Sequence, residues 1–114
     1  MKVPLRFPDL HPRSAAAVLD FELLQEKASA LGRLGRALEA ALIALASFDE
    51  GRSSPLSPQD RQARRLLVRR AAEASWNLSV QREACGLSGS EALMRDYRVP
   101  AVVQFAMGSG PDPA

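Results

Sequence analysis

Apolar residues follow a helical spacing from residue 14 to about residue 49, a stretch that contains no proline. Ser14 is a suitable N-cap, because its hydroxyl can accept a hydrogen bond from an amide of the first turn. Four leucines that recur every seven positions mark one side of this stretch: Leu24, Leu31, Leu38 and Leu45. The pattern predicts one long helix with a broad apolar side.

A second helix is predicted after the loop at residues 50–58, which is rich in Gly, Ser and Pro. Ser57 and Pro58 supply an N-cap and a first-turn proline, and Gly86 can end the helix at about Cys85. Apolar residues of this helix fall on two sides: Ala63, Leu67, Ala71, Ala74, Leu78 and Cys85 on one, and Leu66, Trp76, Val80 and Ala84 on the other. Two apolar sides require two packing partners.

Two short helices are predicted at the C-terminal end. Ser88 and Glu91 have the spacing of a capping box, which predicts a helix over residues 88–97. Pro100 interrupts it, because the residue before a proline resists helical angles, and the last helix is expected over residues 100–108.

These elements predict an all-α protein, a long antiparallel two-helix hairpin with two short C-terminal helices. Residues 1–13 are expected to form an irregular arm, residues 14–108 a single helical domain, and residues 109–114 a disordered tail. A helix of about 36 residues is about 54 Å long, whereas a compact chain of this size is only about 35 Å across. One chain cannot cover such a helix evenly, so we expect a homodimeric helical bundle.

The residues expected at this packing or dimer interface are Leu24, Leu31, Leu34, Leu38, Leu42, Leu45, Phe48 and Trp76. Gly32 and Gly35 interrupt the same helix, and each costs it about 1 kcal/mol relative to alanine. Either another helix or the C-terminal segment approaches the backbone there, or the glycines are a tolerated weak point.

Composition adds a cellular expectation. The chain of 114 residues carries a net charge of +2 and one cysteine, so it has no internal disulfide and suits a reducing cytosol. Prolines and the absence of an apolar run argue against a signal peptide at the start. A run of about eighteen apolar residues, as a membrane span needs, is also absent. We expect a soluble cytoplasmic protein.

Arginines are concentrated at the start of the second helix. Arg61, Arg65 and Arg69 follow one another at four-residue spacing and could track a phosphate backbone. Asp60 is the one acid among the six arginines of residues 51–70: Arg52, Arg61, Arg64, Arg65, Arg69 and Arg70. No aromatic residue is interleaved with them for base stacking, so nucleic-acid binding is the alternative and local charge matching between helices is favoured.

The C-terminal pair of short helices resembles a helix-turn-helix in outline. Gln104 is the one polar side chain from Ala101 to Met107, whereas a recognition helix needs several polar and basic residues. We expect this helix to be buried.

Candidate catalytic and metal-binding residues lack companions. His11 is the one histidine, and no cysteine pair or second histidine accompanies it. Cys85 is expected to fill apolar space, with Arg82 nearby as the argument for a reactive thiolate. Glu22 and Glu26 lack the Glu-x-x-His partners of a di-iron bundle and are expected in solvent. No catalytic, cofactor-binding or metal-binding residue is predicted.

Three segments carry a resemblance: FELLQEKASALGRLGRALEAAL, WNLSVQREACGL and DYRVPAVVQFAMG. Together they resemble a family of small uncharacterised bacterial α-helical proteins, grouped as a domain of unknown function, over about residues 18–108. The resemblance implies a helical fold and no established activity or cofactor. The sequence therefore favours a non-enzymatic interaction or scaffold protein that acts as a homo-oligomer, with nucleic-acid binding as the alternative.

Overall fold

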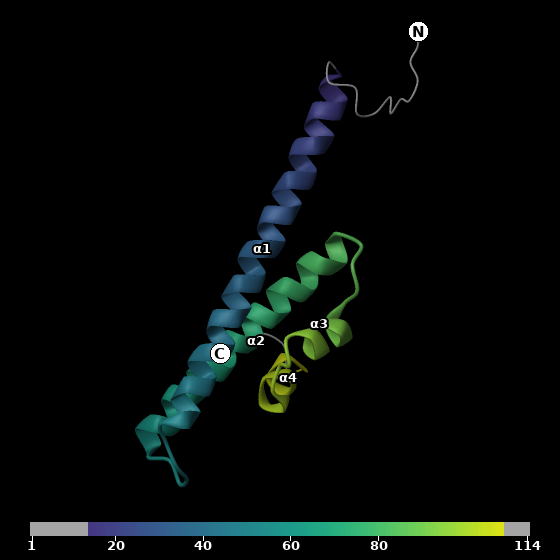
Figure 1. Ribbon diagram of the computed structural model, residues 1–114. Coiled ribbons are helices and arrows are strands. Elements are labelled where there is room, and N and C mark those ends of the chain that lie inside the picture. The colour runs from purple at the N-terminus through teal and green to yellow at the C-terminus, as the bar shows by residue number, and fades with distance from the viewer. Residues whose placement is uncertain (1–13, 109–114) are drawn as a thin grey trace. The chain divides into compact units, whose positions relative to one another are not determined.

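The computed structural model describes residues 14–108, which are helical apart from short connections (Figure 1). No strand occurs in this part of the chain, so the predicted all-α class is confirmed. Contacts divide the chain into two units, residues 1–30 and residues 31–114, which are described separately. The predicted arm and tail lie outside the described residues. The four helices are α1 (Ala15–Glu50), α2 (Pro58–Ala84), α3 (Ser90–Asp96) and α4 (Ala101–Gly108).

Serine caps begin both long helices. The Ser14 hydroxyl accepts a hydrogen bond from the Ala17 amide at 3.1 Å, and the Ser57 hydroxyl accepts one from the Asp60 amide at 3.0 Å. Each cap satisfies a first-turn amide that has no partner within the helix. Pro58 follows as the first residue of α2. Both predicted helix starts are confirmed.

The predicted end of α2 is also confirmed. Gly86 adopts a left-handed conformation with φ of 78°. The Leu87 amide donates to the Arg82 carbonyl at 2.9 Å, and the Gly86 amide donates to the Glu83 carbonyl at 3.0 Å. These two bonds form a Schellman motif, in which glycine is preferred because it has no Cβ to clash.

The end of α3 repeats this pattern without a glycine. Arg98 takes the left-handed position with φ of 52°. The Val99 amide donates to the Met94 carbonyl at 3.0 Å, and the Arg98 amide donates to the Arg95 carbonyl at 3.3 Å. A side chain in this conformation costs energy that a glycine avoids.

The predicted capping box at the start of α3 is wrong. The helix begins at Ser90 with Gly89 as its N-cap, and no side chain caps it. Groups from the end of α2 occupy this connection instead. The Ser88 carbonyl accepts a hydrogen bond from Arg82 Nε at 3.1 Å, and Glu83 Oε2 lies 2.6 Å from where a Cβ on Gly89 would stand. A side chain at position 89 would require the Glu83 carboxylate to move, and α3 begins at Ser90 rather than directly after Ser88 as the capping box predicts.

The unit from residue 31 onward contains the core. In it, α2 packs against the second half of α1 and runs antiparallel to it, and both α3 and α4 contact α2 (Figure 1). All four helices and the α3–α4 connection contribute buried apolar side chains: Leu38, Leu45, Val68, Ala71, Ala72, Leu78, Leu93, Val99 and Val103. The buried Ser75 hydroxyl is satisfied, because it donates to the Ala71 carbonyl at 2.8 Å.

Gly35 lies at a close approach within this unit. A Cβ on it would stand 2.8 Å from Tyr97 Oη, at the end of α3, so the C-terminal segment occupies the space that the glycine leaves. Gly32 is different, because a Cβ on it would stand 3.3 Å from Nη1 of Arg36, a flexible side chain of the same helix. Gly35 is therefore a site of close approach by the C-terminal segment. Gly32 fits the other interpretation, a tolerated weak point in the helix.

Candidate self-association and nucleic-acid surfaces

The first part of α1, within residues 14–30, displays large apolar side chains to solvent. Five of them, named here the α1 apolar segment, are between 43% and 64% exposed: Val18, Leu19, Phe21, Leu23 and Leu24. Ala17 is the buried residue of this stretch. Exposed apolar side chains that occur singly are ordinary, whereas five within seven residues leave this part of the helix with an unusual amount of exposed apolar surface.

The predicted interface residues divide between the core and the surface. Leu38 and Leu45 are buried within the chain itself, at 0% and 3% exposure, so no second copy is needed to cover them. Leu31, Leu34 and Leu42 are partly buried against the same core, and Phe48 is partly buried near the end of α1. Leu24 and Trp76, by contrast, are 61% and 49% exposed. These last two remain available to a partner.

Charge matching joins the end of α1 to the start of α2. Arg64 Nε and Nη2 donate to the two carboxylate oxygens of Asp49 at 2.8 and 2.9 Å, a bidentate pair. These hydrogen bonds lower the pKa of Asp49 below its ordinary value and raise the pKa of Arg64. Burial opposes both shifts, and a smaller Coulombic attraction between the two groups reinforces them. Local charge matching between the helices, the favoured interpretation of the basic segment, therefore holds for Arg64.

Arg52 in the connecting loop is also occupied. Its Nε lies 3.4 Å from Asp60 Oδ1, its Nη1 donates to the Phe48 carbonyl at 3.2 Å, and its guanidinium carbon lies 3.9 Å from the centre of the Phe48 ring. Arg52 and Arg64 therefore both contribute to the connection between α1 and α2.

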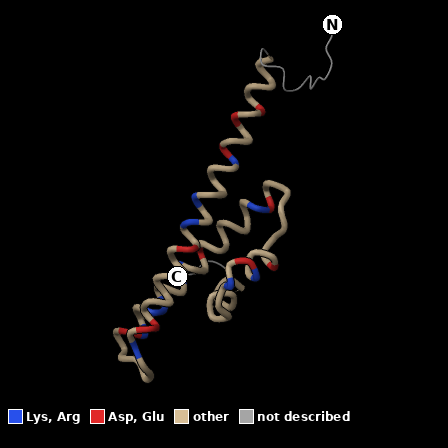
Figure 2. The backbone as a smooth tube through the Cα atoms, viewed as in Figure 1, with Lys and Arg blue, Asp and Glu red and all other residues tan. Residues whose placement is uncertain are grey.

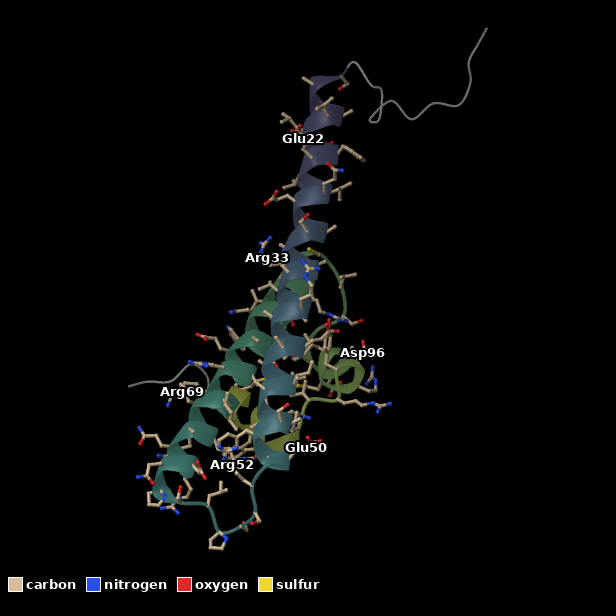
Figure 3. The ribbon with its side chains drawn as sticks, turned by 60° about the vertical axis from the view of Figure 1, so that its left-hand side comes forward. Glu22, Arg33, Glu50, Arg52, Arg69 and Asp96 are labelled. Atoms are coloured by element: carbon tan, nitrogen blue, oxygen red, sulfur yellow. The ribbon has the colours of Figure 1, made fainter. Side chains whose placement is uncertain are left out.

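The predicted arginine stripe lies on the exposed side of α2. Arg61, Arg65 and Arg69 are all exposed, and Figure 3 shows Arg69 reaching outward from the helix. Arg61 Nη1 donates to the Leu56 carbonyl at 2.9 Å, which steadies the side chain without neutralising it. The side chains of all three arginines reach solvent.

An aromatic residue extends this stripe, which the sequence pattern did not reveal. Trp76 follows Arg69 by seven residues and Val80 follows Trp76 by four, so all three lie on one side of a helix with 3.6 residues per turn. Trp76 and Val80 are each 49% exposed. We name Arg65, Arg69, Trp76 and Val80 the α2 outer face. The second apolar side predicted for this helix, which includes Trp76 and Val80, is the signal that could have located it.

The last helix, α4, has one polar side chain and is only partly buried. The one polar side chain of α4, Gln104, donates through its Nε2 to the Val99 carbonyl at 2.8 Å, which ties the side chain to the α3–α4 connection. Val103 is buried, whereas Val102 and Phe105 are 39% and 80% exposed. The expected burial of α4 is therefore correct for one side of the helix only.

The Cys85 thiol lies beside an amide side chain. Cys85 is half-buried, and its Sγ lies 3.6 Å from Gln81 Nε2, which is not a cationic group. Arg82 is directed instead to the Ser88 carbonyl and, at 3.9 Å, to Asp96. Within residues 14–108 no three His, Cys, Asp or Glu side chains gather to hold a metal ion. His11 lies outside that range.

The acidic residues of the first part of α1 are exposed. Glu22 and Glu26 are both open to solvent, as Figure 3 shows for Glu22. Figure 2 shows acidic positions followed by a basic one along this part of the helix. None of the described helices is long and apolar enough to cross a membrane.

Over residues 7–113 the chain matches DUF6665, a family of unknown function, and it belongs to that family. Comparison with curated proteins and with solved structures finds no match in either set.

Proposed function

For this DUF6665 protein we propose a non-enzymatic role as a homodimeric interaction protein whose copies associate through the α1 apolar segment. One observation carries the proposal: five large apolar side chains stand at least 43% exposed within two turns of one helix. Removing apolar surface from water is favourable by about 25 cal/mol per Å². Covering these side chains with a partner would therefore lower the free energy of the protein. A second copy brings an identical apolar surface and is the simplest partner.

The single cysteine suits a reducing compartment, and we place the proposed binding role in the cytoplasm. The segment from Ala15 to Ala30 is about 24 Å long at about 1.5 Å per residue, so two such segments make a small interface. Small interfaces bind weakly, and we propose a dissociation constant on the order of 10 µM.

Sedimentation equilibrium tests the proposal over about 1–300 µM, a range that brackets this constant. The protein should pass from monomer to dimer as its concentration rises. Leu24→Asp should keep it monomeric, because a carboxylate would be buried at the interface. Ile43→Asp is the matched control, since Ile43 is 65% exposed on the second half of α1. A wild type that stays monomeric throughout contradicts the proposal, as does a dimer that tolerates Leu24→Asp.

The alignment of Trp76 with the arginine stripe supports a second candidate, binding of single-stranded nucleic acid by the α2 outer face. Arginines would neutralise phosphates and the indole would stack on a base. The chain has one tryptophan, so its fluorescence reports on this site alone. Single-stranded RNA should quench it at low salt, quenching should weaken steeply as salt rises, and Arg65→Glu should weaken it further. Unchanged fluorescence at low salt would reject this candidate.

A further inference from the structure

One acid and one base share the side of α1 that carries Leu23 and Leu24. Asp20 and Lys27 are seven residues apart, close to two full turns, so they lie on the same side of the helix. Leu23 and Leu24 stand three and four residues from each of them and therefore lie between them on that side. Both leucines are more than half exposed, and Asp20 is exposed as well.

This arrangement is self-complementary in one orientation. If a second copy is antiparallel, with the twofold axis between Leu23 and Leu24, each residue before the axis faces the residue equally far beyond it. Asp20 of one copy then faces Lys27 of the other, and the same pair forms again across the axis. A parallel pair would instead place Asp20 against Asp20 and Lys27 against Lys27, and like charges facing each other are unfavourable.

We propose that two copies of this chain pair antiparallel through the first part of α1. The four leucines at positions 23 and 24 lie in the centre, and one Asp20–Lys27 ion pair lies on each side of them. The proposal rests on the self-association proposed above and specifies its orientation and register. The leucines supply the apolar burial, and the ion pairs select the alignment, because sliding one helix past the other separates the charges.

Charge reversal tests the register by sedimentation. Asp20→Lys or Lys27→Asp alone should raise the dissociation constant at least about tenfold, since two attractive pairs become repulsive in each homodimer. An equal mixture of the two variants should dimerise about as well as the wild type, because every pair is again of opposite sign. The double variant should recover likewise.

Glu22→Lys is the matched control. It changes the net charge as Asp20→Lys does, but position 22 lies on the other side of the helix from Leu24 and Lys27. Its dissociation constant should change less than about twofold at moderate salt. Circular dichroism of each variant checks that helix content is retained, which we expect because positions 20 and 22 are exposed.

Disulfide trapping tests the orientation separately. In a Cys85→Ser background, Asp20→Cys and Lys27→Cys chains should form little disulfide alone and a cross-linked heterodimer when mixed. Efficient cross-linking of each variant with itself would mean a parallel pair and overturn the proposal.

The failures of the two proposals are distinguishable. A wild-type dimer that is indifferent to charge reversal, or in which Glu22→Lys dissociates as strongly as Asp20→Lys, rejects this register and leaves self-association standing. A wild type that is monomeric at every concentration rejects both.

Discussion

Leu24 and Leu38 are the same amino acid on the same helix, and their replacement by alanine should separate folding from assembly. Leu38 is fully buried in the core, whereas Leu24 is 61% exposed. At a protein concentration of about 0.5 µM, where the monomer predominates by the proposed constant, the two variants should differ in their free energy of unfolding.

The magnitudes follow from the burial of each side chain. Leu38→Ala removes a fully enclosed side chain and leaves a cavity, which costs about 3 kcal/mol. That loss is a large part of the free energy of unfolding of a typical domain, which is about 5–15 kcal/mol. Leu24→Ala removes a side chain that is mostly hydrated already. With full burial of leucine worth about 2 kcal/mol, the buried two-fifths accounts for about 0.8 kcal/mol at most.

Urea unfolding followed by circular dichroism measures both losses. Raising the protein concentration about a hundredfold should leave the effect of Leu38→Ala unchanged and enlarge that of Leu24→Ala, because the proposed dimer would bury Leu24. Equal losses for both variants at low concentration would refute this reasoning. So would a loss under about 1 kcal/mol for Leu38→Ala, since the buried leucine would then not be part of a packed core.

Three further predictions concern local structure, each measured by urea unfolding. Gly35→Ala should raise the free energy of unfolding by about 1 kcal/mol, the helix preference of alanine, only in a Tyr97→Phe background, where no tyrosine oxygen meets the new methyl group. Gly32→Ala should raise it with or without Tyr97→Phe. Equal gains at both glycines would contradict the close approach. Arg98→Gly should stabilise by up to about 1 kcal/mol by relieving the left-handed conformation, and a loss of stability would show that the arginine side chain matters more. The stability advantage of the wild type over Asp49→Asn should be complete above pH 3.8, the ordinary pKa of the carboxyl group, and should shrink as the pH falls through the lower pKa of the folded state. An advantage independent of pH would mean that the ion pair contributes nothing.

Sequence patterns predicted the helices best where the deciding interactions are local. The caps at Ser14 and Ser57 and the left-handed glycine at position 86 join groups within one or two turns, so a short stretch of sequence contains both partners. The start of α3 shows the opposite case. Arg82 and Glu83, from the preceding helix, occupy the connection, and the serine-glutamate spacing carries no sign of them.

Long-range contacts and exposure could not be predicted in the same way. The helical spacing of leucines is uniform from Leu24 to Leu45, although the structure buries the later ones and exposes the first. Gly35 was ambiguous because its neighbour, Tyr97, belongs to a distant part of the chain. Arg98 gave no signal at all, since a left-handed residue other than glycine is chosen by the hydrogen bonds around it rather than by its own preference.

The two proposed surfaces lie on different helices, so one does not compete with the other for the same side chains. In the proposed dimer the α1 apolar segment joins two copies, and each copy carries its own α2 outer face. A dimer therefore offers two cationic faces, and once one has bound a long strand the second binds at a high effective concentration. Nucleic-acid affinity, if present, should then fall with Leu24→Asp for a long strand and stay constant for a strand too short to reach both faces. Loss of affinity for both lengths would instead place nucleic acid on α1 itself.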